Sequence, residues 1–409
     1  MIKKNICVLG LGYIGLPTAA LLASEGYLVN GVDTNEEIIS KINEGKAHIY
    51  EPGLDELVRL TVESNMFKAA LIPSSSDIFI IAVPTPIHNY NNILTPNIDY
   101  VMMAVKSIIG IIRENNSIII ESTIPVGTTL KIELLLKKNG IDITKVNIAH
   151  CPERVLPGNI LHELIYNDRV IGGINNISSS VIEDFYKTFV KGNIYKTDSK
   201  TAEMCKLTEN SFRDVNIAFA NELSMICDKE EIDVLKLINL TNKHPRVNIL
   251  QPGPGVGGHC IAIDPWFIIS QHKLLSNLMK TARDVNLKKT QWVIDKILEN
   301  CNSFKEKKGR KPIIAFFGLT FKADIDDTRE SPSLQIIETL NKQEFETVVI
   351  DPNIKLLENI NLMDFTQAIN IADIFVFLVK HKEFININIS KQLINKDVLD
   401  FCGLLEMKS

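Results

Sequence analysis

Three glycines near the N-terminus follow the spacing GxGxxG. Gly10, Gly12 and Gly15 lie between an apolar run and a helical pattern, and Asp33 ends the next apolar run. In such a turn the first glycine permits a sharp bend, the second lets the backbone approach a pyrophosphate, and the third lets helix and strand pack closely. A carboxylate at position 33 would accept hydrogen bonds from an adenosine ribose and repel a 2′-phosphate. We therefore expect NAD rather than NADP at this turn; a turn that serves packing alone is the alternative.

A second glycine-rich segment ends in a cysteine. Residues 252–260 read Pro-Gly-Pro-Gly-Val-Gly-Gly-His-Cys, and Asp264 follows four residues later. Glycines let backbone amides approach a ligand, and a thiolate at Cys260 could attack a carbonyl carbon. Since most cysteines only pack, an inert side chain is the alternative.

Polar residues elsewhere could complete a reaction site. Lys206, Asn210 and Arg213 have the spacing i, i+4 and i+7, so they share one face of a predicted helix. This face either directs a lysine and an amide into a cleft between domains, or it is a polar face exposed to solvent. Glu153 follows the apolar run 146–149, where parallel sheets place ligand-facing loops, which makes it a candidate general base or a member of a structural ion pair.

The elements that position these residues form three predicted domains. Apolar runs alternate with helical patterns over residues 1–197, which is typical of a doubly wound α/β domain. Long helical patterns without strand signals fill residues 198–302. A charged stretch, residues 303–311, is interpreted as a linker, and the first pattern recurs beyond it. The predicted C-terminal domain, which includes this linker, spans residues 303–409. The expected fold is thus α/β, with two Rossmann-like doubly wound domains flanking a central all-helical domain that also packs subunits together.

Composition excludes several classes of protein. The 409 residues include 44 basic and 49 acidic side chains, a net charge of −5, which argues against a nucleic-acid surface. The seven cysteines lack CxxC spacing, which favours a reducing compartment and offers no metal site. The apolar stretch from Ile6 to Val29 follows Lys3 and Lys4 as in a signal peptide, but glycines and Pro17 interrupt it. We expect a cytoplasmic protein without a membrane segment.

Seven ordered strings resemble the UDP-glucose/GDP-mannose dehydrogenase family over essentially the whole chain. They are GLGYIGLP from residue 10, VPTP from 83, ESTIPVGTT from 121, CPERVLPG from 151, AEMCKLTEN from 202, PGPGVGGHCIAIDP from 252 and FGLTFKADIDDTRESP from 317. The strings CPERVLPGN, NDRVIGG from 167 and KHPRVNI from 243 favour the members that act on 2-acetamido sugars. Members that act on UDP-glucose tend to have an apolar residue in place of Arg154.

The resemblance implies a four-electron oxidation of the C6 alcohol of a UDP-sugar, most specifically UDP-N-acetyl-D-mannosamine, with two NAD in succession. The product would serve bacterial surface polysaccharide synthesis. The resemblance also implies a homodimer or a higher homo-oligomer. It implies no metal site. The implied catalytic residues are Cys260, Lys206, Asn210, Glu153, Asp264 and Thr123. The implied cofactor contacts are Gly10, Gly12, Tyr13, Ile14, Gly15, Asp33, Thr85, Thr123 and Arg329. The implied substrate contacts are Arg154, Val155, Lys206, Asn210, Arg213, His244, Arg246, Gly257, Phe321 and Lys322.

One departure and several alternatives accompany the resemblance. Where relatives commonly carry a basic residue in a C-terminal turn, this chain has Cys402 between Asp400 and Gly403. The sugar could instead be UDP-GlcNAc or UDP-glucose. A two-electron hydroxyacid dehydrogenase would not use Cys260, and an NAD-binding redox sensor would use it for regulation.

Overall fold

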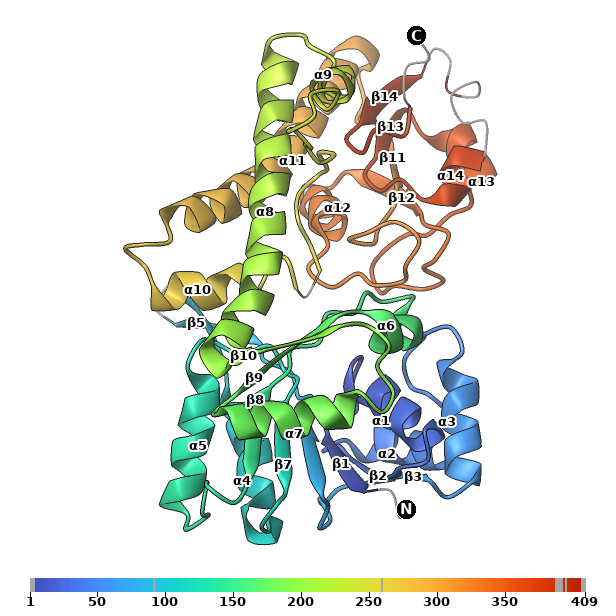
Figure 1. The fold of residues 1–409 in the computed structure, drawn as a ribbon. Coiled ribbons are helices and arrows are strands. Elements are labelled where there is room, and N and C mark those ends of the chain that lie inside the picture. The colour runs from blue at the N-terminus through green and yellow to red at the C-terminus, as the bar shows by residue number, and fades with distance from the viewer. Residues whose placement is uncertain (1–3, 91–92, 259, 387–392, 394–395, 406–409) are drawn as a thin grey trace. The chain divides into compact units, whose positions relative to one another are not determined.

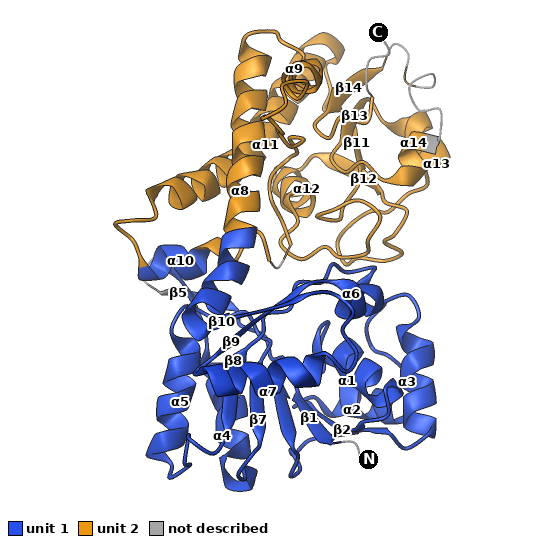
Figure 2. Ribbon diagram, viewed as in Figure 1, with its two compact units in different colours: residues 1–209, 266–271 blue, residues 210–265, 272–409 orange. Residues whose placement is uncertain are grey.

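The computed structural model describes residues 4–90, 93–258, 260–386, 393 and 396–405. The chain forms two compact units (Figure 2). The first comprises residues 1–209 and 266–271, and the second comprises residues 210–265 and 272–409.

An eight-stranded sheet organises the first unit (Figure 1). Its order is β10-β9-β8-β7-β4-β1-β2-β3, and every neighbouring pair is parallel except β8 and β9. The central strands are continuous apolar runs buried on both faces, as parallel sheets require. The strands are β1 (Asn5–Leu9), β2 (Leu28–Val32), β3 (Phe67–Ala70), β4 (Ile78–Ile81), β7 (Ser117–Ile120), β8 (Asn147–His150), β9 (Arg169–Gly173) and β10 (Ile194–Asp198), with a separate hairpin of β5 (Ile87–Tyr90) and β6 (Ile93–Pro96).

Helices cover both faces of this sheet. One core joins Ile6 and Val8 of β1 to α1, α3, α6 and α7, and another joins Cys7 and Leu9 to α4 and α5. Alternate residues of one strand thus enter different cores, which confirms the doubly wound prediction. The helices are α1 (Gly15–Ser24), α2 (Glu36–Asn43), α3 (Leu54–Glu63), α4 (Asp99–Ile108) followed by the short 3-10 helix η1 (Ile109–Ile111), α5 (Thr128–Lys138), α6 (Ile160–Tyr166), α7 (Asn176–Tyr186) and α10 (Pro265–Gln271).

Long helices form the middle of the chain, as predicted. They are α8 (Ser199–Lys229), α9 (Val234–Thr241) and α11 (Asn277–Lys308). The predicted linker over residues 303–311 is wrong, because α11 continues to Lys308 and ends at Gly309, whose φ is +71°. Phe304 explains the difference: its side chain is buried in a core with Cys301, so the charged residues around it lie on the exposed face of a helix.

The C-terminal sheet repeats the design of the first on a smaller scale. Four parallel strands have the order β12-β11-β13-β14, and apolar cores lie on both faces. The Ser331 side chain caps α12 at the Leu334 amide, and Pro332 occupies its first turn. The elements are β11 (Ile313–Phe317), α12 (Pro332–Lys342), β12 (Glu346–Ile350), α13 (Phe365–Ile371), β13 (Ile374–Phe377), α14 (Lys382–Asn386) and β14 (Asp397–Asp400).

The two sheets share one turn geometry. In the first, the Gly10 amide donates to Val32 O and the Leu11 amide donates to Asp33 Oδ2, at 2.8 and 2.9 Å. In the second, the amides of residues 318 and 319 donate to Ile350 O and Asp351 Oδ2, at 2.9 and 2.7 Å. The second α/β domain therefore shares this turn with the first, although its sheet has four strands where the first has eight, and the predicted fold class is confirmed.

Within the part of the chain that the structure describes, no helix combines the length and apolar character needed to cross a membrane.

Candidate functional site

The first glycine turn is built for close backbone packing and for a ligand. Gly10 has a φ of +90°, and a Cβ there would lie 2.6 Å from Ala82 O. A Cβ on Gly15 would overlap the carbonyl of Gly10. At Gly12, by contrast, no protein atom lies within 4 Å of the position a Cβ would take. Of the three glycines, Gly12 is therefore the one with open space beside it, and it lies where a pyrophosphate would approach.

Other residues of the turn also suit NAD. Tyr13 and Ile14 complete the turn, and Ile14 is the N-cap of α1, so the helix presents its first amides and the positive end of its dipole here. Asp33 accepts from the amides of Leu11 and Asn35 through different oxygens, at 2.9 and 3.0 Å. Each oxygen keeps a lone pair for a ribose hydroxyl. These residues would hold the pyrophosphate and the adenosine ribose of NAD.

Further predicted residues follow neighbouring strands of the same sheet. Thr85 follows β4, Thr123 follows β7 and Glu153 follows β8. The Ser122 hydroxyl donates to Val83 O at 2.7 Å and joins the first two of these loops. The strand order reverses between β1 and β4, so these loops lie at the carboxyl edge where doubly wound sheets bind ligands.

A buried charge cluster surrounds Glu153. Its carboxylate pairs with Arg169 at 3.0 Å, and both side chains are almost fully buried. Arg169 also lies over the ring of Tyr186, 4.7 Å from its centroid, and the Tyr186 hydroxyl donates to Glu121 Oε1 at 2.7 Å. Burial and the nearby charge of Glu153 raise the pKa of Glu121 to about 7. One guanidinium thus serves two buried carboxyl groups.

Glu203 attaches the start of α8 to the loop that follows β7. Its carboxylate accepts from the Gly127 amide at 2.5 Å and from the amide and hydroxyl of Thr129, each at 2.7 Å. These donors belong to the first turn of α5, where a carboxylate also meets the positive end of the helix dipole. Lys206 lies one turn further along α8 and is half-buried. Burial lowers the pKa of His150, at the end of β8, to about 3, and the charge of Lys206 contributes to this lowering.

Arg154 is held by a partner on α8. Its guanidinium contacts both carboxylate oxygens of Glu209, at 2.8 and 3.2 Å, and donates to Asp168 O at 3.2 Å. The neighbouring Val155 is half-buried. Arg154 therefore has a fixed position from which its remaining surface could meet a substrate.

The structure joins three of the predicted catalytic residues in the second unit. The Asn210 side-chain amide donates to Asp264 Oδ2 at 2.5 Å. The Asp264 backbone amide donates to Cys260 O at 2.8 Å. Asp264 is buried, whereas Cys260 is exposed. Asp264 thus connects a residue of α8 to the cysteine loop, through its carboxylate on one side and its backbone amide on the other.

The glycines of the cysteine loop also pack against the loop that follows β11. A Cβ on Gly257 would lie 2.8 Å from the Phe321 side chain, and one on Gly258 would lie 2.7 Å from its ring. The Gly258 amide donates to Arg329 O at 3.2 Å. Part of the glycine content therefore serves close packing and is not available to a ligand. Lys322 is exposed, and the Arg329 guanidinium pairs with Asp327 at 2.6 Å.

The other predicted substrate contacts lie at the surface of the second unit. Arg213, His244 and Arg246 are exposed, and the Arg246 backbone amide donates to His244 Nδ1 at 3.4 Å. At the C-terminal turn, Lys380 Nζ donates to the carbonyl of Gly403 at 2.7 Å, so a basic side chain reaches the turn that contains Cys402.

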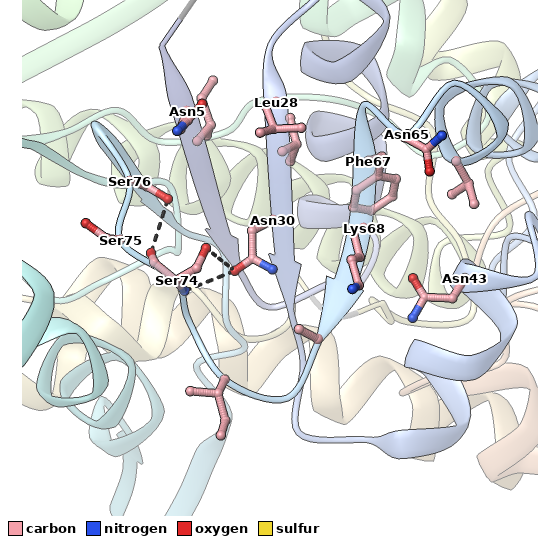
Figure 3. A pocket seen from close by; sticks show the side chains of 15 residues that line it. Asn5, Leu28, Asn30, Asn43, Asn65, Phe67, Lys68, Ser74, Ser75 and Ser76 are labelled. Carbon is pink, nitrogen blue, oxygen red and sulfur yellow. Dashed lines mark hydrogen bonds between the residues drawn. The ribbon is translucent and has the colours of Figure 1, made fainter.

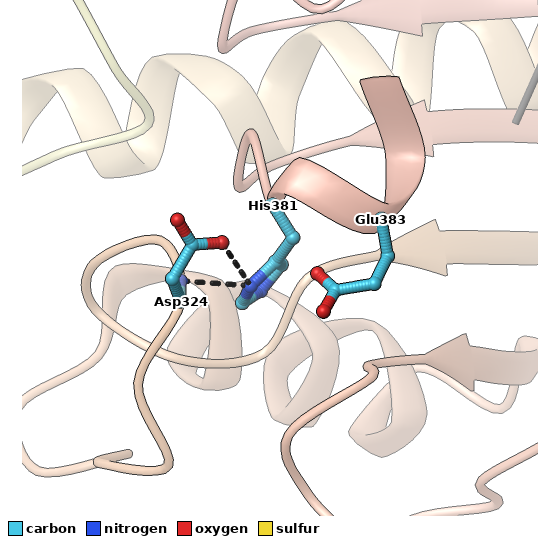
Figure 4. A group of neighbouring side chains, drawn as sticks. All are labelled: Asp324, His381 and Glu383. Carbon is cyan, nitrogen blue, oxygen red and sulfur yellow. Dashed lines mark hydrogen bonds and ion pairs between the residues drawn. The ribbon is translucent and has the colours of Figure 1, made fainter. Parts of the chain in front are cut away.

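Two other features lie apart from the predicted residues. A pocket of about 760 Å³ opens beside the amino ends of β1, β2 and β3, where Asn5, Leu28 and Phe67 line it (Figure 3). Asp324, His381 and Glu383 form a small polar cluster (Figure 4). His381 Nδ1 lies 3.1 Å from the Asp324 amide and Nε2 lies 3.2 Å from Asp351, so the ring connects the loop after β11 to the residue that follows β12.

Sequence reasoning missed four buried or paired acids and bases. Glu121, Arg169, Glu203 and Glu209 each lie inside or beside the strings that carry the family resemblance. Their residue types could have indicated that each has a partner of opposite charge or a hydrogen-bond partner. A charged side chain that is buried requires such a partner.

The doubly wound domain, its dinucleotide turn and the thiol loop define a nicotinamide-dependent dehydrogenase. Three models of the UDP-glucose/GDP-mannose dehydrogenase family match the chain: the NAD binding domain over residues 4–190, the central domain over 200–288 and the UDP binding domain over 315–407. The chain belongs to this family and binds NAD.

Individual relatives match over nearly the full length. A UDP-N-acetyl-D-mannosamine dehydrogenase of Campylobacter jejuni is 49% identical, over 98% of this chain and 99% of its own. An NDP-N-acetyl-D-galactosaminuronic acid dehydrogenase of Ralstonia solanacearum is 45% identical, over 99% and 97%. The structure of the UDP-N-acetyl-mannosamine dehydrogenase of Staphylococcus aureus superposes with a TM-score of 0.89 at 40% identity, over 98% of this chain and 96% of the other.

Proposed function

We propose that the protein oxidises UDP-N-acetyl-D-mannosamine at C6 to UDP-N-acetyl-D-mannosaminuronate. The observation that carries the proposal is the connection of Asn210, Asp264 and Cys260. The Asp264 carboxylate accepts from the Asn210 amide, the Asp264 backbone donates to the backbone of Cys260, and the Cys260 side chain is exposed, which suits a covalent aldehyde oxidation. NAD, when bound, accepts one hydride in each of two successive oxidations.

The first oxidation converts the C6 alcohol to an aldehyde. The hydroxyl proton must leave as the C6 hydride departs, and Glu153 or a water that it polarises is the proposed acceptor. Lys206 and Asn210, one turn apart on α8, are proposed to stabilise the negative charge that develops on the C6 oxygen. Thr123, after β7, is proposed to lie beside the reacting groups.

The second oxidation requires a covalent bond to Cys260. An aldehyde has no hydroxyl to deprotonate, so the thiolate adds to C6 and the carbonyl oxygen takes up a proton, which gives a thiohemiacetal. Loss of the remaining hydride and of the hydroxyl proton gives a thioester. Water then adds to the thioester carbon, and the C–S bond breaks to release the carboxylate and restore the thiolate. Asp264 is proposed to position this water, with Glu153 as base.

The choice of sugar is supported by two kinds of observation. The Campylobacter jejuni and Ralstonia solanacearum relatives are both named for 2-acetamido sugars. Arg154, which pairs with Glu209, occupies a position where family members that act on UDP-glucose tend to have an apolar residue. An arginine there favours a 2-acetamido sugar. UDP-GlcNAc and UDP-glucose are the alternative substrates. The same proposal includes the predicted roles of the other cofactor and substrate contacts and the three predicted domain boundaries. It also includes a cytoplasmic location and a role in surface polysaccharide synthesis.

NADH formation on a panel of nucleotide sugars tests the proposal. The panel contains UDP-N-acetyl-D-mannosamine, UDP-GlcNAc, UDP-glucose and GDP-mannose. We expect UDP-N-acetyl-D-mannosamine to give the highest kcat/KM of the four, with two NADH formed per sugar. Cys260→Ser should stop the second NADH, while Cys227→Ala, at a buried cysteine of α8, should keep both. One NADH with free aldehyde from the unaltered enzyme would contradict the mechanism. A preference for UDP-glucose would contradict only the substrate. Ordinary turnover without any partner protein would exclude a pure redox sensor.

We also propose a homodimer formed through the middle helices. Phe212, Phe219 and Ile226 recur every seven residues on α8 and are 70%, 57% and 52% exposed. Such a stripe would bury its apolar surface against a second copy. Sedimentation of Phe219→Glu tests the interface: we expect the unaltered protein to sediment as a dimer and the variant as a monomer. A monomeric unaltered protein would overturn this part of the proposal.

A further inference from the structure

A buried polar network joins α8 to α11 within the second unit. Asp214 Oδ1 accepts from Arg283 Nη1 at 2.6 Å and from Asn286 Nδ2 at 2.8 Å. Asn286 Oδ1 in turn accepts from Asn221 Nδ2 at 2.9 Å. All four side chains are at least 98% buried. Burying so many polar groups costs free energy unless their partners are fixed, so the network sets the relative position of the two helices.

The same network reaches the loop that carries Cys260. Asn221 Oδ1 accepts from the Gly253 amide at 2.9 Å, near the start of the loop. Arg283 Nη1 approaches Ile261 O at 3.5 Å, just beyond the cysteine. Thr290, also on α11, donates its hydroxyl to Pro254 O at 3.0 Å. Two helices therefore hold backbone groups on both sides of the thiol.

Close packing leaves the middle of this loop little freedom. A Cβ on Gly255 would overlap the Thr290 hydroxyl, and one on Gly258 would lie 2.7 Å from the Phe321 ring. Side chains thus confine Gly255 and Gly258 beside the hydrogen-bonded residues 253 and 254, so a change at these hydrogen bonds displaces a closely packed segment.

We propose that Asn221 and Thr290 are positioning residues that fix the place of the Cys260 thiol by holding the backbone of Gly253 and Pro254, at the start of the loop that carries it. The inference rests on the proposed function of Cys260 as the nucleophile. Neither side chain is required to touch substrate or NAD. Their effect falls on the second oxidation, because only that step needs the sulfur within bonding reach of C6, and a displacement of about 1 Å can lower the rate of such a step by about 100-fold.

Thr290 offers an almost isosteric test. Thr290→Val removes the hydroxyl that reaches Pro254 O, whereas Thr290→Ser keeps it. With the nucleotide sugar that gives most NADH in the panel above, we expect Thr290→Val to lower the rate of the second hydride transfer by about 10-fold or more, with aldehyde released. The first transfer should change much less, and Thr290→Ser should stay near the unaltered enzyme.

Asn221→Leu tests the neighbouring hydrogen bond at the start of the loop, which the Gly253 amide donates. Ser224→Ala is its matched control, since Ser224 is also buried on α8 and bonds to Lys289 of α11, at 2.9 Å, without reaching the loop. We expect Asn221→Leu alone to release aldehyde and to speed hydrogen exchange at the Gly253 amide. The exchange measurement needs no substrate, so it reports on the loop independently of activity.

Three outcomes overturn the inference. It fails if Thr290→Val yields two NADH per sugar at the unaltered rates, if Thr290→Ser is as impaired as Thr290→Val, or if Ser224→Ala releases as much aldehyde as Asn221→Leu. A different result, aldehyde release by the unaltered enzyme, would reject the proposed function instead.

Discussion

Arg169 and Glu153 form an ion pair of 3.0 Å in which both side chains are almost fully buried. The guanidinium lies on β9 and the carboxylate follows β8, so the pair connects two strands that meet in an antiparallel arrangement. Glu121 and Tyr186 extend it into a cluster under the proposed general base. The charge that positions Glu153 thus also supports the fold.

Removal of the guanidinium should destabilise the protein strongly. Arg169→Met would leave Glu121 and Glu153 buried without a cation, and we expect the free energy of unfolding to fall by about 3–5 kcal/mol. Urea denaturation measures this change. Arg59→Met removes two exposed ion pairs of α3, with Glu56 and Glu63, and should change stability far less, because solvent screens exposed pairs. Equal effects of the two substitutions would show that the buried pair is not special.

The raised pKa of Glu121 makes stability depend on pH. The folded-state pKa is about 7 and the unfolded reference is 4.5, so the folded state binds the proton more tightly. The contribution of Glu121 is complete below pH 4.5 and declines as pH rises towards 7, by about 1.4 kcal/mol per pH unit. Glu121→Gln lacks this decline. The difference in stability between variant and unaltered protein should therefore grow in favour of the variant from pH 4.5 to 7. Parallel pH profiles would contradict this.

Loss of the Glu203 carboxylate should lower both the stability of the protein and its catalytic rate. Glu203→Ala leaves the Gly127 and Thr129 amides and the Thr129 hydroxyl without their acceptor, and we expect a loss of about 2–4 kcal/mol. Because Lys206 is one turn away on α8, kcat should fall as well. Thermal unfolding and steady-state NADH formation measure the two effects. Glu203→Gln keeps one acceptor and should be intermediate in both; full activity in the alanine variant would refute the link.

Lys289 should destabilise the protein at neutral pH. Burial lowers its pKa from 10.5 to about 7, although its ammonium lies 3.7 Å from the Trp292 ring centroid and donates to Ser224. Between pH 7 and 10.5 the unfolded state binds more protons, so stability from this group rises with pH. Lys289→Met should raise the melting temperature at pH 7, and its advantage should shrink towards pH 10. A variant less stable than the unaltered protein at pH 7 would show that the cation–π contact outweighs burial.

The sequence alone determined the doubly wound fold class, the dinucleotide turn and the repetition of the α/β pattern at the C-terminal end. Continuous apolar runs and glycine spacing are local properties, so the alternation of strands and helices over residues 1–197 could be predicted, and β1, β2 and β7 are such apolar runs. The spacing of Gly10, Gly12, Gly15 and Asp33 likewise follows from what one turn must do.

The tertiary structure decided which distant residues share charges and hydrogen bonds. Phe304 turns a charged segment into the end of α11 because its ring enters a core assembled from other elements. The partners of Glu153, Arg154 and Asn210 lie 16, 55 and 54 positions away along the chain. No local pattern encodes such pairs, since they form only when strand order and helix packing bring the side chains together.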